Sequence, residues 1–198
     1  MKLNLGCGFH HLPGYVNVDR FADAAPDVLH DLEQMPWPFD TDSVDEIVAR
    51  HVLEHMGATF AGFAALFREI YRVCRHRARL MIVVPHHLHA TFVADPTHVR
   101  AYTPLTFQMM SQVRNRQWIE RDENYTMLAR MLGVDFELAA ASQAYDPVWL
   151  DKVARGEMTR ADLREAAASR IGVVREIRVI MRAVKPLRAD PPDWRRKR

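Results

Sequence analysis

The chain has 198 residues, 48% of them hydrophobic, which suits one domain with a sizeable core and is too small for two ordinary domains. Its 27 basic and 25 acidic residues nearly balance, and residues 195–198 supply the excess of positive charge, so a nucleic-acid partner is not expected. No apolar run reaches the roughly 18 residues of a membrane span, and a strand-like segment follows Met1 directly, which predicts a cytoplasmic protein. Two cysteines, Cys7 and Cys74, are too few for a disulfide framework.

Short apolar runs alternate with helical patterns in the first half of the chain, as in a parallel sheet with helices packed on it. Strands are predicted at residues 3–5, 15–18, 45–49 and 80–84. Between the last two strands, apolar residues recur at helical spacing and predict an amphipathic helix over residues 58–75.

The second half combines further helices with two long strands. Thr103 followed by Pro104 predicts a helix start, and Gly133 predicts the end of a helix that begins near Tyr125. Strands predicted at residues 136–144 and 173–184 would pair antiparallel. A helical insertion at about 146–172 separates them, with Thr159 and Asp162 as a partial capping box. These elements predict one domain over residues 1–188 and a disordered basic tail over residues 189–198.

Two glycines, Gly6 and Gly8, follow the first strand directly, where the chain must turn tightly and a ligand can lie against bare backbone. The second strand ends at Asp19, whose carboxylate can accept hydrogen bonds from both hydroxyls of a ribose. Residues 9–14 between these features contain Pro13 and are too few for a full helix. Because dinucleotide sites need a helix N-terminus for their pyrophosphate, the spacing favours S-adenosylmethionine, which has no phosphate.

The motifs of residues 2–85 resemble those of the class I S-adenosylmethionine-dependent methyltransferases, especially the small bacterial type-11-like group. The resemblance implies a Rossmann-like, doubly wound α/β sheet of seven strands, mostly parallel with one antiparallel strand and with helices on both faces. It rests on Leu-Asn-Leu-Gly-Cys-Gly at residues 3–8, Pro-Gly-Tyr-Val-Asn-Val-Asp at 13–19, His-Asp-Leu at 30–32, Ser-Val-Asp-Glu-Ile at 43–47 and His-Val-Leu-Glu-His at 51–55.

The same resemblance implies where the methyl donor lies. The glycine motif would contact its amino-acid part, Asp19 its ribose, and Asp31 with Leu32 its adenine, while residues 50 and 51 would border the methionine carboxylate and the methyl group. Two departures affect the first loop, because Asn4 stands where many relatives have Asp and His10 where a third glycine is usual. The predicted cofactor-binding residues are Asn4, Gly6, Cys7, Gly8, Asp19, Arg20, Asp31, Leu32, Arg50 and His51.

Histidines crowd the loop after the strand at 80–84, namely His86, His87, His89 and His98. This loop leaves the carboxyl end of a parallel strand, where doubly wound sheets bind ligands, and histidine titrates near neutral pH. A polar surface loop and a role in proton transfer are both open. His51, His86 and His98 are the predicted catalytic bases, and His86 and His98 are expected to bound the cavity facing the methyl group, with Asp95 and Tyr102 close by. No metal site is predicted, since no zinc-type ligand spacing occurs in the loop.

The predicted function is methyl transfer from S-adenosylmethionine to an unidentified acceptor, a hydroxyl or amine of a small molecule, saccharide or metabolite. Two alternatives stay open, since fold alone does not set function: a non-catalytic binding module with this fold, and a nucleotide-sugar enzyme on a similar sheet. The expected partner is a small-molecule substrate, and a homodimer is left open.

Overall fold

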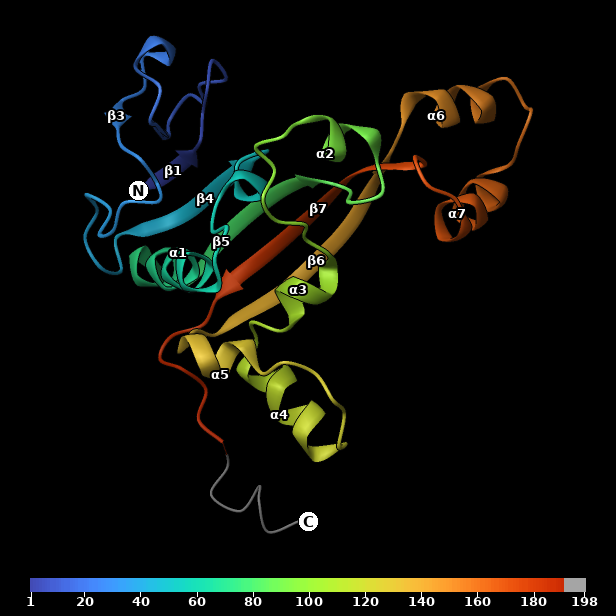
Figure 1. Ribbon diagram of the computed structural model, residues 1–198. Helices are drawn as coiled ribbons and strands as arrows, with labels where there is room; N and C mark the ends of the chain where they lie inside the picture. The colour runs from blue at the N-terminus through green and yellow to red at the C-terminus, as the bar shows by residue number, and fades with distance from the viewer. Residues whose placement is uncertain (191–198) are drawn as a thin grey trace.

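The computed structural model describes residues 1–190 (Figure 1). None of the helices among these residues is long and apolar enough to cross a membrane. The predicted tail at 189–198 lies outside the described residues from position 191 onward. At the centre is a seven-stranded sheet in the order β3-β2-β1-β4-β5-β7-β6.

Strand β7 is the one antiparallel member of the sheet: it pairs antiparallel with β5 and with β6, whereas all pairs from β3 to β5 are parallel. This confirms the predicted fold class. Strand β3 was not predicted, since its two residues are too few to show an alternation of apolar and polar positions. The strands are β1 (Lys2–Leu5), β2 (Val16–Asp19), β3 (Val28–Leu29), β4 (Val44–Arg50), β5 (Cys74–Pro85), β6 (Phe136–Tyr145) and β7 (Val174–Ala183).

The helix boundaries follow the predicted capping residues. Thr103 caps a helix whose first residue is Pro104, Gly133 ends another with φ of 67°, and Thr159 forms a reciprocal capping box with Asp162. The helices are α1 (Phe60–Val73), α2 (Ala90–Ala94), α3 (Pro104–Gln108), α4 (Gln112–Glu120), α5 (Leu128–Leu132), α6 (Pro147–Ala154) and α7 (Arg160–Ser169), with 3-10 turns η1 (Ala22–Ala24) and η2 (Leu53–His55).

The apolar core covers one face of the sheet. Leu3, Ile47, Leu80 and Met181 are paired across β1, β4, β5 and β7, so their side chains share a face, and all four are at most 1% exposed. Helix α1 buries an apolar stripe in the same cluster, and α3 contacts β6 and β7.

On the opposite face, the residues that precede Leu3, Ile47 and Leu80 form a polar row. Glu46 lies between Lys2 and Arg79, at 3.4 and 2.5 Å, and the Lys2 ammonium lies over the ring of Tyr15. The connections before and after β2 contain only the 3-10 turn η1, because neither has room for a longer helix. These two connections therefore contribute no α-helix to either face of the sheet.

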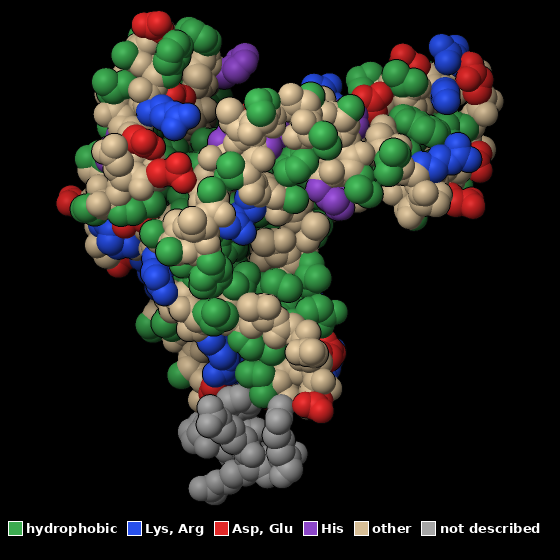
Figure 2. Space-filling model, in the orientation of Figure 1, with side chains coloured by type: hydrophobic (Ala, Val, Ile, Leu, Met, Phe, Trp, Pro, Cys, Tyr) green, Lys and Arg blue, Asp and Glu red, His purple; other side chains and the backbone are tan. Residues whose placement is uncertain are grey.

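Helices α6 and α7 occupy the predicted insertion and project sideways from the body of the molecule (Figures 1 and 2). They carry a small apolar cluster of their own, built on Leu163, Ala166 and Val173. Nε2 of His89 lies 3.1 Å from Oδ2 of Asp146, the N-cap residue of α6. This bridge ties the insertion to the loop after β5.

The last described segment is fixed to the body by a buried carboxylate. Asp135 is fully buried. Its oxygens accept two hydrogen bonds from the Arg188 guanidinium, both at 2.7 Å, and one from the backbone N–H of Gln112. Beyond this pair, Asp190 accepts two hydrogen bonds from Arg130.

We predict that Arg188→Ala lowers the free energy of unfolding by about 3 kcal/mol, since it leaves the carboxylate of Asp135 buried without its cation. Urea denaturation followed by circular dichroism measures the difference. Arg164→Ala removes an exposed arginine of α7 and should change stability by less than about 0.5 kcal/mol. Equal effects of the two substitutions would show that the Asp135 pair does not stabilise the fold.

Candidate functional site

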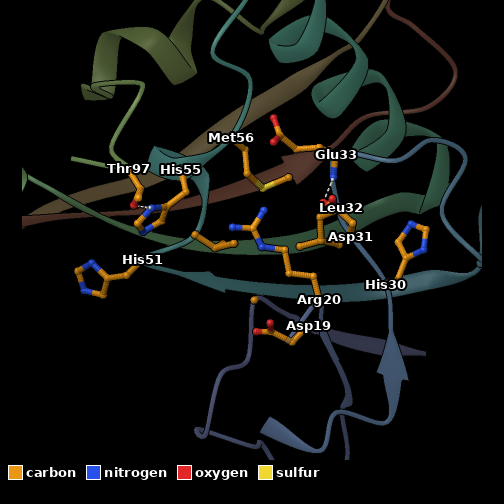
Figure 3. Close-up of a pocket in the computed structure, with 12 residues that line it drawn as sticks. Asp19, Arg20, His30, Asp31, Leu32, Glu33, His51, His55, Met56 and Thr97 are labelled. Carbon is orange, nitrogen blue, oxygen red and sulfur yellow. Dashed lines mark hydrogen bonds between the residues drawn. The ribbon is translucent and has the colours of Figure 1, made fainter. Parts of the chain in front are cut away.

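A cavity of about 290 Å³ lies at the carboxyl ends of β1 to β4 (Figure 3). The chain leaves β1 toward β2 on one side, while β4 lies on the other side, so the cavity is at the point where the strand order reverses. Open α/β sheets bind their ligands at this position. The cavity is lined by Gly6, Asp19, Arg20, His30, Asp31, Leu32, Glu33, His51, Val52, His55, Met56 and Thr97.

Gly6 begins the loop after β1 and must be glycine for two reasons. Its φ is 60°, in the left-handed region that L side chains rarely adopt, and a Cβ there would lie 2.8 Å from the Val52 Cβ. Gly8 also has positive φ, 48°, yet nothing lies within 4 Å of the place where its Cβ would be. The backbone of Gly6 therefore forms a wall of the cavity directly against the loop after β4.

Asp19 is oriented by backbone amides. Its Oδ2 accepts a hydrogen bond from Gly8 N at 2.8 Å, and its Oδ1 accepts one from Phe21 N at 2.9 Å. An ionised carboxylate has about four acceptor positions, so it can still accept hydrogen bonds from a ligand. Two loops thus hold this side chain at the cavity wall, as the sequence predicted.

Asn4 and Cys7 are buried and are absent from the cavity wall. The Asn4 amide donates to Asn17 Oδ1 and to the His10 carbonyl oxygen, both at 2.9 Å. An aspartate could not donate these bonds, whereas the acceptor on His10 is its backbone carbonyl, which any residue at that position provides. Burial raises the pKa of the Cys7 thiol. The two side chains support the loop from beneath, so the predicted cofactor contact is limited at most to backbone atoms.

The segment after β3 forms another wall. Asp31 Oδ1 accepts from Glu33 N at 3.0 Å, and the Leu32 carbonyl accepts from the indole of Trp37, which fixes the path of this turn. Glu33 Oε1 accepts from Gly57 N at 2.8 Å and so joins this wall to η2. Arg20 is exposed at the end of β2 and extends into the cavity (Figure 3).

His51 follows β4 and faces two carboxylates. Its Nδ1 lies 3.4 Å from Glu54 Oε1 and its Nε2 lies 3.2 Å from Glu176 Oε1. Glu54, followed by Glu176, raises the pKa of His51 above its ordinary value although burial opposes this. Both ring nitrogens therefore face protein carboxylates, which does not suit the role of a base. Arg50 is exposed and does not line the cavity.

The structure does not place His86 or Tyr102 on the cavity wall. Burial and the neighbouring His87 and His89 lower the pKa of His86, and its Nδ1 accepts from Leu88 N. Tyr102 is fully buried in the apolar core, because its ring stacks on Phe107. His86, which was predicted to bound the cavity, is therefore absent from the lining of the cavity described here, and Tyr102, which was expected close by, belongs to the core.

His98 lies behind the wall, where its ring packs edge-on against that of His55 with 4.6 Å between the centroids. Ligand atoms of Glu54, His55 and His98 lie within 4.8 Å of one another. Sequence reasoning missed this group because it examined ligand spacing within one loop, whereas Glu54 and His55 come from the segment after β4. It also missed His30 on the wall, although the His-Asp-Leu motif contains it, and Glu33, Met56 and Thr97, which no motif marks.

The family model described as a methyltransferase domain matches residues 13–82, which include β2 to most of β5. This match confirms the resemblance predicted from the motifs. No curated protein matches the chain.

Solved structures share the fold over nearly the whole chain. An S-adenosylmethionine-dependent methyltransferase from Archaeoglobus fulgidus is 15% identical, with a TM-score of 0.57 over 91% of this chain and 85% of that one. A putative methyltransferase from Bacillus halodurans is 17% identical, with a TM-score of 0.54 over 93% and 92%. The [4+2]-cyclase SpnF is 13% identical, with a TM-score of 0.52 over 92% and 75%. At these identities the likeness establishes the fold.

We predict that Gly6→Ala destabilises the protein more than Gly8→Ala does. Both substitutions force a side chain into the left-handed region, at about 1 to 2 kcal/mol, but only the first also crowds Val52, at about 1 to 3 kcal/mol more. Urea denaturation of both variants tests this. If Gly8→Ala is equally destabilising, the close approach to Val52 does not constrain this loop.

Proposed function

We propose that this chain, a class I S-adenosylmethionine-dependent methyltransferase by its family match and its fold, methylates a hydroxyl or amine of a small molecule. The observation that carries the proposal is the single cavity wall formed by the ends of four neighbouring strands, with Asp19 held by amides beside the bare backbone of Gly6. The acceptor would enter from the side of Thr97 and His55, because the β1, β2 and β3 side is used by the donor.

The cavity residues fit this donor. Gly6 lines the cavity with bare backbone, against which the amino-acid part of the donor can lie, and Asp19 keeps acceptor positions for two ribose hydroxyls. Asp31 and Leu32 border the space for adenine, and His51 borders the space for the methionine carboxylate. When bound, the donor supplies a methyl group activated by a positively charged sulfur.

The chain then has three tasks in the transfer, which are to align the acceptor, to exclude water and to let its proton leave. Of the predicted bases, His51 lines the cavity but has both ring nitrogens facing carboxylates. His98 is separated from the cavity by His55, and His86 is outside the wall. We therefore infer that alignment contributes more than a dedicated base.

The fold allows other chemistry, since one similar structure is a cyclase rather than a methyltransferase. A binding module without turnover would keep the donor site and lack an acceptor site. Formation of S-adenosylhomocysteine distinguishes a methyltransferase from both of these alternatives.

For the donor site, we predict that Asp19→Ala weakens binding of S-adenosylmethionine by about 1.5 to 3 kcal/mol, the range for losing hydrogen bonds to a charged group. Isothermal titration calorimetry measures this affinity. Asp23→Ala, in the exposed turn η1, is the matched control and should bind as the unmodified protein does. Unchanged affinity in folded Asp19→Ala protein would overturn the ribose assignment.

For the reaction, we predict that the protein forms S-adenosylhomocysteine when it is incubated with S-adenosylmethionine and the small-molecule fraction of a cell extract. Mass spectrometry detects both this product and any compound heavier by one methylene group. A parallel incubation uses the macromolecular fraction. Product formation only with the second fraction would contradict a small acceptor, and donor binding without product in either would support the binding module.

A further inference from the structure

The buried carboxylate of Glu54 faces one imidazole, that of His51, but accepts no hydrogen bond. Its side chain is 1% exposed, and neither oxygen has a hydrogen-bond partner, although His51 Nδ1 lies 3.4 Å from Oε1. Removing a carboxylate from water without such partners is costly, so a buried group of this kind usually indicates a bound ion or water. The backbone does not relieve it, because the amides of Val99 and Arg100 donate to the Glu54 carbonyl instead.

Two imidazoles each bring a ligand atom within 4.8 Å of the other ligand atoms of this group, and each ring makes a contact through its Nδ1. His98 Nδ1 lies 2.8 Å from the Phe92 carbonyl oxygen, so Nδ1 carries the proton and Nε2 is free to accept. His55 Nδ1 lies 2.8 Å from Thr97 Oγ1, whose own proton is donated to Asp95 at 2.6 Å. His55 is thereby held as the tautomer with a proton on Nδ1 and a lone pair on Nε2.

We propose that Glu54, His55 and His98 bind one divalent cation of the zinc type. One carboxylate and two imidazoles are ligands that Zn²⁺ takes at about 2.0 to 2.2 Å, which places ligand atoms about 3.4 Å apart in a tetrahedron. The three ligand atoms lie within 4.8 Å of one another, so a small rotation of the side chains closes the site. Orientation of both imidazoles through Nδ1 is the arrangement that ligating histidines show.

The site adjoins the donor cavity. His55 and Thr97 are part of the cavity wall, so a cation on these ligands would be reached from the cavity. Three protein ligands leave a fourth position for an exchangeable group. A hydroxyl of the acceptor at that position would lie beside the methyl donor, a role that rests on the proposed function, whereas cation binding itself does not.

The first test measures the metal content of the full chain after equilibrium dialysis against Zn²⁺ and then against metal-free buffer. We expect one Zn²⁺ per chain, and visible d–d absorption of a low-symmetry site when Co²⁺ replaces it. Glu54→Gln and His98→Asn should weaken Zn²⁺ binding more than about 100-fold, beyond the effect of losing only an outer hydrogen bond, whereas Thr97→Val should weaken it about 10- to 100-fold. His87→Asn, in the histidine-rich loop but outside the cluster, should bind as the unmodified protein does.

Thermal denaturation provides a readout independent of activity. Zn²⁺ should raise the melting temperature of the unmodified protein and of His87→Asn, and not that of Glu54→Gln. Glu54→Gln should fold, because it removes a buried charge without changing the shape of the side chain. An unmodified protein without stoichiometric metal, or variants that retain it, would overturn the site. Donor titration of chelated protein tests the donor site separately, so the failure of one proposal is distinguishable from the failure of the other.

Discussion

The close approach of Gly6 to Val52 determines the geometry on which the candidate site depends. Strands β1 and β4 are neighbours, and the chain leaves them in opposite directions, so their two exit loops meet at one edge of the sheet. With no Cβ at Gly6, the loops can touch while a concave space opens above them. Asp19, His51 and the turn at Asp31 then face a common cavity although they lie far apart in the sequence.

Short-range patterns placed every strand except β3, because each of the others contains an apolar stretch or an alternation of apolar and polar residues. They missed the first six residues of β5, which include three arginines and a histidine. The capping residues Thr103, Gly133 and Thr159 also predicted helix boundaries, since each acts within its own turn. The distribution of helices was less predictable. Whether a face is covered depends on the length of the connections that cross it, and the loop between β1 and β2 is held by Asn4, Asn17 and the His10 carbonyl rather than by a helix.

The candidate site, too, was predictable from the sequence only in part. Gly6, Asp19, Asp31 and Leu32 were predictable because they belong to contiguous motifs at strand ends, and all four line the cavity. The contacts of the histidines could be recognised only from the three-dimensional structure. His89 is the N-cap of α2 and a partner of Asp146. His98 lies near Glu54 and His55, which precede it by more than forty positions, and no rule on the spacing of metal ligands reveals such a group.

The insertion of α6 and α7 has a consequence for how this molecule can diversify. It has its own apolar cluster, and it joins the remaining structure through the ends of β6 and β7 and the contact between His89 and Asp146. Residues of this arm can therefore be exchanged, shortened or extended without repacking the principal core. A lineage that altered only this arm would present a new outer surface to its surroundings while the strand ends around Gly6 and Asp19 kept their arrangement.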